Sequence, residues 1–215
     1  MNSRLFVQGF SADCLIIRGE YQRAIHETDA ICGIASDFGF PYFVACGLML
    51  KGRAASRLGQ GDGVSFLEKG LQLYRSTGAK WALPKWLGWF ASAPGQQVDV
   101  ARATLGEAFD LVHETGERFN EAELYHLRGE LSLSVSAADE CASEADFLLA
   151  KRIAADQGAK LFELRAATSL ARLWRDQGKL IEARDLLAPI YGWFTEGFDT
   201  LDLKQAKALL DELTA

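Results

Sequence analysis

The sequence lacks the features of a membrane or secreted protein. No apolar run approaches the roughly 20 residues that a membrane-spanning helix needs, and the opening MNSRLFVQGF lacks the shape of a signal peptide. The four cysteines, Cys14, Cys32, Cys46 and Cys141, are widely spaced and form no CxxC pair. This spacing is typical of a reduced thiol set, so we expect a cytoplasmic protein that does not bind a membrane.

Motifs that carry chemistry are also missing. There is no GxxxxGK[ST] phosphate loop, no HExxH zinc pair and no nucleophile motif around Ser65, Ser92 or Ser169. The GQGDG stretch at 59–63 follows a predicted helix rather than a strand and carries no Lys-Ser/Thr, which favours a turn. The three histidines lack the spacing of metal ligands. We therefore predict a non-catalytic protein with no cofactor and no metal.

The charge pattern offers no broad basic face. The net charge is −6, and the stretch from Glu117 to Asp146 accounts for that value with eight acidic and two basic residues. The next stretch, from Lys151 to Arg175, has six basic residues against two acidic ones. An acidic unit is thus followed by a basic one, which argues against nucleic-acid binding.

The clearest pattern present is the stretch from Gly158 to Gly197. Apolar residues recur there at spacings of three and four in each half, as on one face of each of two helices. Gly178 separates the halves, where a left-handed residue often ends a helix. Small Ala171 and Ala183 would let the two helix axes approach closely. The stretch predicts a helical hairpin that cannot bury its apolar surface alone.

The same pattern is repeated along the chain. Glycines in similar contexts recur at intervals of 39, 38, 42 and 39 residues, namely Gly39, Gly78, Gly116, Gly158 and Gly197. A second set marks the turn inside every unit but the fourth, namely Gly19, Gly59, Gly95 and Gly178. In the fourth unit Ser136 stands where the turn glycine would be. Such periodicity is typical of stacked helical repeats.

The fold class that we predict is all-α, an α-solenoid of about five tetratricopeptide-like helix pairs with a C-terminal capping helix at 201–214. We expect one repeat domain over 1–215, with units at 1–38, 39–77, 78–115, 116–157 and 158–197. The predicted helices before the fifth unit cover 1–18, 20–37, 40–58, 62–77, 81–93, 97–115, 119–135 and about 141–157. Small residues at the predicted helix contacts are Gly52, Gly63, Gly70, Gly88 and Gly129.

Two levels of resemblance support this assignment. The positions of Ala171, Trp174, Gly178 and Ala183 resemble the small, large, turn and small positions of a tetratricopeptide repeat. Nearly the whole chain resembles the C-terminal repeat region of bacterial multidomain regulators. The most specific segments are EAELYHLRGEL and ATSLARLWRDQGK. Those regulators carry a class III nucleotide cyclase or DNA-binding domain, then a signal-transduction ATPase domain, before the repeats. The resemblance implies a bacterial signalling role without any activity of its own.

The first helix of each unit is expected to line the inner face of such an array. In the fifth unit this places Arg165, Thr168, Arg172 and Arg175 on an exposed surface. The corresponding residues are Glu123, His126, Glu130 and Leu133 in the fourth unit, and Arg53 in the second. One interpretation is a groove that binds acidic groups of a partner through arginine. The other is that the arginines pair with Glu123 and Glu130 of the adjacent unit.

The segment WALPKWLGWF is the second candidate site. Trp86 and Trp89 could bind a peptide or a ring-bearing ligand. They could equally pack between neighbouring units, which is the more usual place for tryptophan.

The N-terminal helix carries apolar residues around most of its circumference, including Phe6 and Phe10. Such a helix is normally buried on more than one side, so the N-terminal edge is expected to be an interface. It could dock on upstream domains of a longer regulator, or it could form a homodimer. The sequence therefore favours a protein-protein interaction or regulatory domain with a protein or peptide partner. The alternative is a sensor domain for a small ligand.

Overall fold

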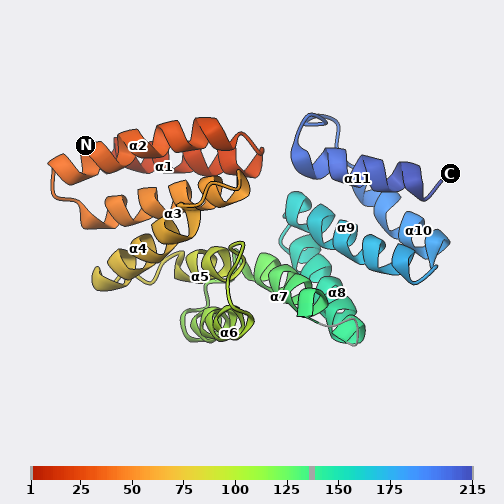
Figure 1. Ribbon diagram of the computed structural model, residues 1–215. Coiled ribbons are helices and arrows are strands. Elements are labelled where there is room, and N and C mark those ends of the chain that lie inside the picture. The colour runs from red at the N-terminus through yellow and green to blue at the C-terminus, as the bar shows by residue number, and fades with distance from the viewer. Residues whose placement is uncertain (1, 136–138, 215) are drawn as a thin grey trace. The chain divides into compact units, whose positions relative to one another are not determined.

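A computed structural model describes residues 2–135 and 139–214 (Figure 1). These residues form eleven α-helices, and none of them lies in a strand. The chain divides into two compact units, Met1–Ala108 and Phe109–Ala215, and each is described by itself. The all-α prediction is confirmed, whereas the assignment of the whole chain to one domain stays a prediction.

The first unit holds five whole helices and the start of a sixth. They are α1 (Asn2–Ile17), α2 (Tyr21–Asp37), α3 (Pro41–Arg57), α4 (Gly63–Ser76), α5 (Leu83–Ala91) and α6 (Val98–Thr115), the last of which ends in the second unit. Each of the helices α1 to α4 packs on the next one in the chain, and α3 also contacts α1 and α5. This pattern is that of stacked helical hairpins.

The second unit holds five further helices with the same packing pattern. They are α7 (Glu121–Val135), α8 (Glu140–Asp156), α9 (Lys160–Asp176), α10 (Leu180–Tyr191) and α11 (Leu201–Glu212). Successive helices pack on one another, and α9 also contacts both α7 and α11. The first helices of successive hairpins therefore lie side by side in this unit.

The predicted glycine punctuation is confirmed in detail. All nine turn glycines adopt a positive φ, from 66° at Gly39 to 81° at Gly178. At Gly39 the amide of Phe40 donates to the carbonyl of Ala35 at 2.8 Å and that of Gly39 to Ser36 at 3.1 Å. These two bonds are the usual helix stop around a left-handed glycine. The position of Ser136 lies outside the described residues.

One predicted helix is shorter than expected. The range 81–93 becomes Leu83–Ala91, because Ala82 precedes it with φ 59°. Ala82 is the only residue other than glycine with positive φ among the residues that the structure describes. The hydroxyl of Tyr74 donates to the carbonyl of Trp81 and holds this turn.

Small residues mark the places where helices meet. A Cβ built on Gly52 would lie 2.7 Å from both Cγ and N of Leu67, and one built on Gly70 would lie 2.8 Å from the sulfur of Met49. In the second unit, a Cβ on Gly129 would lie 2.7 Å from the ring of Phe147. Ala171 has no exposed surface, as predicted. Each small side chain therefore admits a large one from the facing helix.

The last helix, α11, is buried on one side, while Lys204, Lys207 and Asp211 on its other side are exposed. Leu203, Ala206 and Leu209 are buried in one cluster with Ala171 and Leu187. The helix thus occupies the place of a further first helix beside α9. Its charged residues are consequently brought close to the side chains of α9.

The glycine contacts predict that two Gly→Ala substitutions change the free energy of unfolding in opposite directions. Gly52→Ala should lower the free energy of unfolding by about 1–3 kcal/mol, because the added methyl group would meet the backbone of α4. Gly106→Ala is the matched control, since nothing lies within 4 Å of a Cβ at that helical position. It should raise stability by about 0.5–1 kcal/mol. Urea unfolding measures both values, and an unaffected Gly52→Ala variant would contradict the close contact.

Candidate functional site

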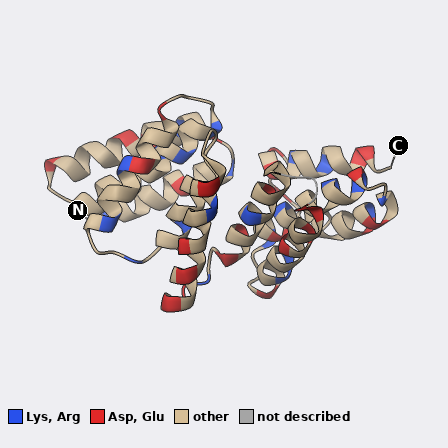
Figure 2. Ribbon diagram, turned by 60° about the horizontal axis from the view of Figure 1, so that its bottom comes forward, with Lys and Arg blue, Asp and Glu red and all other residues tan. Residues whose placement is uncertain are grey.

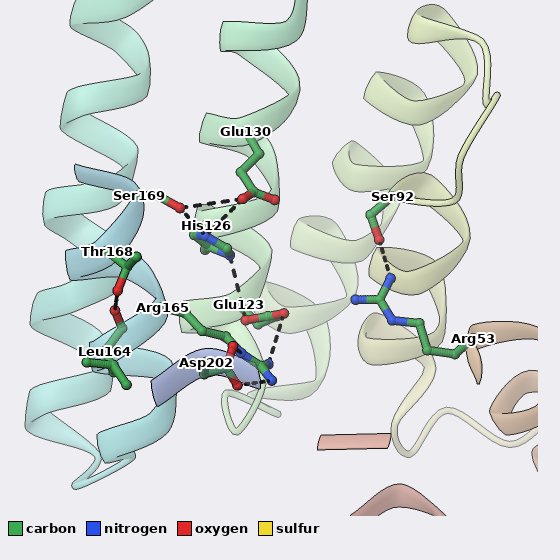
Figure 3. A network of polar contacts seen from close by, with 10 residues as sticks. All are labelled: Arg53, Ser92, Glu123, His126, Glu130, Leu164, Arg165, Thr168, Ser169 and Asp202. Carbon is green, nitrogen blue, oxygen red and sulfur yellow. Dashed lines mark hydrogen bonds and ion pairs between the residues drawn. The ribbon is translucent and has the colours of Figure 1, made fainter. Parts of the chain in front are cut away.

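A polar surface on α9 and its neighbours is the candidate site. Its members come from α7, α9 and α11, and we call it the α9 polar face. It consists of Glu123, His126, Glu130, Arg165, Ser169, Arg172, Arg175, Asp202, Gln205 and Glu212. Figure 3 shows how several of these side chains, including His126, Arg165 and Asp202, lie relative to their contact partners.

Arg165 is held from two sides. Its Nε and Nη2 donate to the two carboxylate oxygens of Asp202 at 3.0 and 2.9 Å. Its Nη1 lies 3.5 Å from Oε1 of Glu123. The side chain of Arg165 is 21 % exposed, and those of Glu123 and Asp202 are 5 and 15 % exposed. A bidentate pair of this kind fixes the plane of the guanidinium group (Figure 3).

The other two arginines of α9 also reach α11. Arg175 donates to Glu212 at 2.6 Å and to its neighbour Asp176 at 2.9 Å. Hydrogen bonds to Asp176 and Glu212 raise the pKa of Arg175. Arg172 donates only to the neutral side chain of Gln205, at 3.4 Å, among the described residues. Arg172 is therefore the one arginine of the three with no carboxylate partner in the described part of the chain.

His126 is the centre of a second cluster on this face. Its Nε2 lies 2.9 Å from Oγ of Ser169 and 3.4 Å from Oε1 of Glu130. Its Nδ1 lies 3.8 Å from Oε2 of Glu123, beyond hydrogen-bond distance. His126 and Ser169 are 7 and 8 % exposed, so the cluster joins α7 to α9 inside the unit.

The serine, histidine and glutamate do not have the surroundings of a catalytic triad. Ser169 lies in the middle of α9, where helix geometry commits the backbone amides to carbonyls one turn earlier. Those amides are thus unavailable as oxyanion donors. The Ser169 contact instead gives Nε2 of His126 and Oγ of Ser169 a hydrogen-bond partner in a buried place.

The predicted exposed positions need correction. Glu123, His126 and Thr168 are buried, at 4, 7 and 5 % exposure, because α7, α9 and α11 pack closely. Thr168 donates to the carbonyl of Leu164 at 2.7 Å, within its own helix (Figure 3). Glu130 is exposed, and the arginines meet α11 more closely than they meet α7. Of the expected pairings with the preceding unit, the described residues show the longer Arg165–Glu123 contact.

Arg53 and the tryptophans lie in the first unit. Arg53 is 6 % exposed, donates to Oγ of Ser92 at 2.9 Å, and lies 5.4 Å from the ring centre of Trp89. Trp86 and Trp89 are 4 and 6 % exposed, and their ring centres are 5.2 Å apart. The interpretation that these rings pack between neighbouring hairpins therefore accounts for their position.

A lysine of the same segment covers both rings. Nζ of Lys85 lies 4.9 Å from the ring centre of Trp86 and 4.6 Å from that of Trp89, and it pairs with Asp13 of α1. The ion pair joins Lys85 on α5 to Asp13 on α1, and the cation–π contacts hold Lys85 against the two rings. No local pattern predicts this contact, because Asp13 and Lys85 are 72 positions apart.

The described residues show no centre for a metal. They contain no group of three or more His, Cys, Asp or Glu side chains arranged to hold a metal ion. Helices long and apolar enough to cross a membrane are likewise absent from the described residues. Figure 2 shows basic and acidic positions interspersed along the ribbons of both units.

Comparisons with known proteins identify the fold. The solved structures that are similar to this chain include two of the nearly identical TPR-like repeats of a putative kinesin light chain of Podosopora anserina. One, a variant with a single substitution, has 18 % sequence identity and a TM-score of 0.59 over 88 % of this chain and 94 % of that chain. The other has 17 % identity and a TM-score of 0.57 over 99 % and 97 %. The fold is thus a TPR-like α-solenoid, as predicted.

Comparisons at the level of sequence add nothing to this assignment. No protein-family model matches the chain, and no curated protein matches it either.

The environments of the four cysteines give a prediction about the order in which they react. Burial raises the pKa of Cys46 to about 12, and burial also raises the pKa of Cys32. At pH 8 the Cys46 side chain is then almost entirely the unreactive thiol. Cys14 and Cys141 are exposed and should react with iodoacetamide first in dilute protein. Mass spectrometry of the alkylated peptides measures the order. All four should react alike in urea, and early labelling of Cys46 in the native protein would contradict its burial.

Proposed function

We propose that this chain is a non-catalytic protein-interaction domain that binds an acidic segment of a protein partner through the α9 polar face. The observation that carries the proposal is Arg172, a half-buried guanidinium group without a carboxylate partner among the described residues. Arg165 and Arg175 precede and follow it on the same helix. A partner carboxylate at Arg172 would complete the series of contacts along α9.

The neighbours of Arg172 prepare it for this role. The bidentate contact with Asp202 fixes Arg165, and the contact with Glu212 places Arg175. A guanidinium group in an ordered setting loses less side-chain entropy when it binds than one on a free surface. A hydrogen bond to a charged group is worth about 1.5–3 kcal/mol, which is enough to select acidic residues.

Other residues of the α9 polar face then have supporting roles. Glu123 and Asp202 hold Arg165, while His126 and Ser169 join α7 to α9. Glu130 is exposed at the edge and would repel an acidic partner that extends toward α7. The partner segment is therefore expected to follow α9 and α11 rather than α7.

The partner that we propose is a preceding domain of a bacterial multidomain regulator. The support is the resemblance of EAELYHLRGEL and ATSLARLWRDQGK to the repeat regions of such proteins. A neighbouring class III cyclase or signal-transduction ATPase domain should then form a complex with this chain on size-exclusion chromatography. The buffer should be reducing, because we expect the protein to be cytoplasmic. The ligand-sensor alternative has less support, because Trp86 and Trp89 are buried beneath Lys85 and Arg53.

Selection from a random peptide display library tests the acidic preference. Enriched peptides should share Asp or Glu, and their affinity should fall as the salt concentration rises. Arg172→Glu should weaken binding about tenfold or more, because it replaces an attractive contact with a repulsive one.

Arg184→Glu is the matched control for this experiment. Arg184 is an exposed arginine of α10 that donates to its neighbour Asp185. Its reversal changes the net charge equally but lies outside the α9 polar face. Equal loss of binding in both variants, or enrichment of uncharged peptides, would overturn the proposal.

A further inference from the structure

Gln205 is the neutral residue among the α11 side chains that face the arginines of α9. Three of these side chains accept hydrogen bonds, namely Asp202 from Arg165 at 2.9 Å, Gln205 from Arg172 at 3.4 Å and Glu212 from Arg175 at 2.6 Å. The distance at Gln205 exceeds the usual N···O separation of about 2.7–3.2 Å. The contact between Gln205 and Arg172 is therefore the weakest of the three, and it brings no negative charge.

Every acidic residue of α11 already has a basic partner. The pairs are Asp202 with Arg165, Asp211 with Lys207, and Glu212 with Arg175. Ala208 follows Gln205 by three positions and precedes Glu212 by four, so it lies on the same face of the helix but offers no polar group. The helix α11 can therefore give Arg172 a carboxylate only if one of these pairs breaks.

The acidic residues of α9 and the exposed Glu130 of α7 have partners as well. The contacts on α9 are Glu163 with Lys160 at 2.7 Å and Asp176 with Arg175 at 2.9 Å. Oε1 of Glu130 lies 3.4 Å from both Nε2 of His126 and Oγ of Ser169. Among the described residues, Arg172 is thus the one cation of α9 that no carboxylate neutralises.

The choice of glutamine rather than glutamate at position 205 decides whether Arg172 is neutralised. The two side chains have nearly the same size, so a carboxylate there would reach Arg172 and form a charge-assisted pair with it. The amide of Gln205 instead contacts Arg172 through its oxygen and leaves the charge of the guanidinium group uncompensated. Its NH2 group is a donor that this contact does not use. Rotation of the amide would present that donor to a carboxylate that binds Arg172.

We propose that Gln205 determines the specificity of the α9 polar face. Its neutral amide keeps Arg172 open to a partner, and its NH2 group donates to the carboxylate that Arg172 binds. The partner's acidic side chain is thus held by one donor group from α9 and one from α11. The carboxylates of α11 serve only the arginines that hold the two helices together. This inference rests on the acidic partner proposed above.

A carboxylate placed at position 205 tests the proposal without a partner. Gln205→Glu should raise the melting temperature at low salt by about 1–3 °C, because the new carboxylate pairs with Arg172. The rise should be absent in an Arg172→Gln background. Thermal unfolding followed by circular dichroism measures the wild type, both single variants and the double variant. No rise, or a rise that does not depend on Arg172, would show that position 205 does not control this arginine and would overturn the proposal.

Binding of a fluorescein-labelled hexa-aspartate peptide tests the specificity. Gln205→Glu should weaken binding about tenfold or more, because its carboxylate occupies Arg172, and Gln205→Ala should weaken it a few-fold through loss of the second donor. Gln72→Glu, the same charge change at an exposed residue of α4, is the matched control and should bind as the wild type does. If the wild type binds and Arg172→Glu does not, full affinity in Gln205→Glu would overturn this inference alone. A wild type that binds no acidic peptide would overturn the proposed function and this inference with it.

Discussion

The close approach of helix pairs at small residues is the constraint on which the rest of this fold depends. Gly52 lies against Leu67, Gly129 lies against the ring of Phe147, and Ala171 is enclosed with Leu187. Each hairpin thereby buries a large side chain over a small one and gains its apolar contacts. The other face of such a hairpin then packs on the next hairpin, and the hairpins stack for this reason.

In the second unit, this stacking determines where the charges meet. Because α11 buries Leu203 and Ala206 beside α9, its acidic residues come within reach of the arginines of α9. Arg165 and Arg175 are satisfied within the chain, whereas Arg172 faces only Gln205 among the described residues. The apolar packing of α11 therefore both orders the α9 polar face and leaves one guanidinium group available. The proposed acidic partner follows from that difference between neighbouring arginines.

Much of the fold could be predicted from the sequence, because glycine at a left-handed turn is a local requirement that leaves a local signal. The turn at Gly39 was predictable for this reason, and the close contact at Gly52 was predictable because a small residue recurs at that position of the repeat. The left-handed turn at Ala82 was not, because its conformation is maintained by the hydroxyl of Tyr74, eight positions earlier.

The candidate site was predictable in part. Helical spacing placed Arg165, Arg172 and Arg175 on one surface, but their partners on α11 are 33 to 37 positions away. The role of Ser169 was missed, because Ser169 contacts His126 on α7, while Thr168 donates to Leu164 within its own helix. Such contacts depend on how two helices are rotated against each other, which no local pattern specifies.

Hydrogen–deuterium exchange of the intact chain, with and without a selected acidic peptide, tests the central claim most directly. The account predicts slower exchange on binding in Lys160–Asp176 and Leu201–Glu212, the two helices that would contact the peptide. Exchange in α2 and α4 should be unchanged, and Arg172→Glu should remove the protection. Protection confined to the first unit, or protection that survives Arg172→Glu, would contradict a partner site on the α9 polar face.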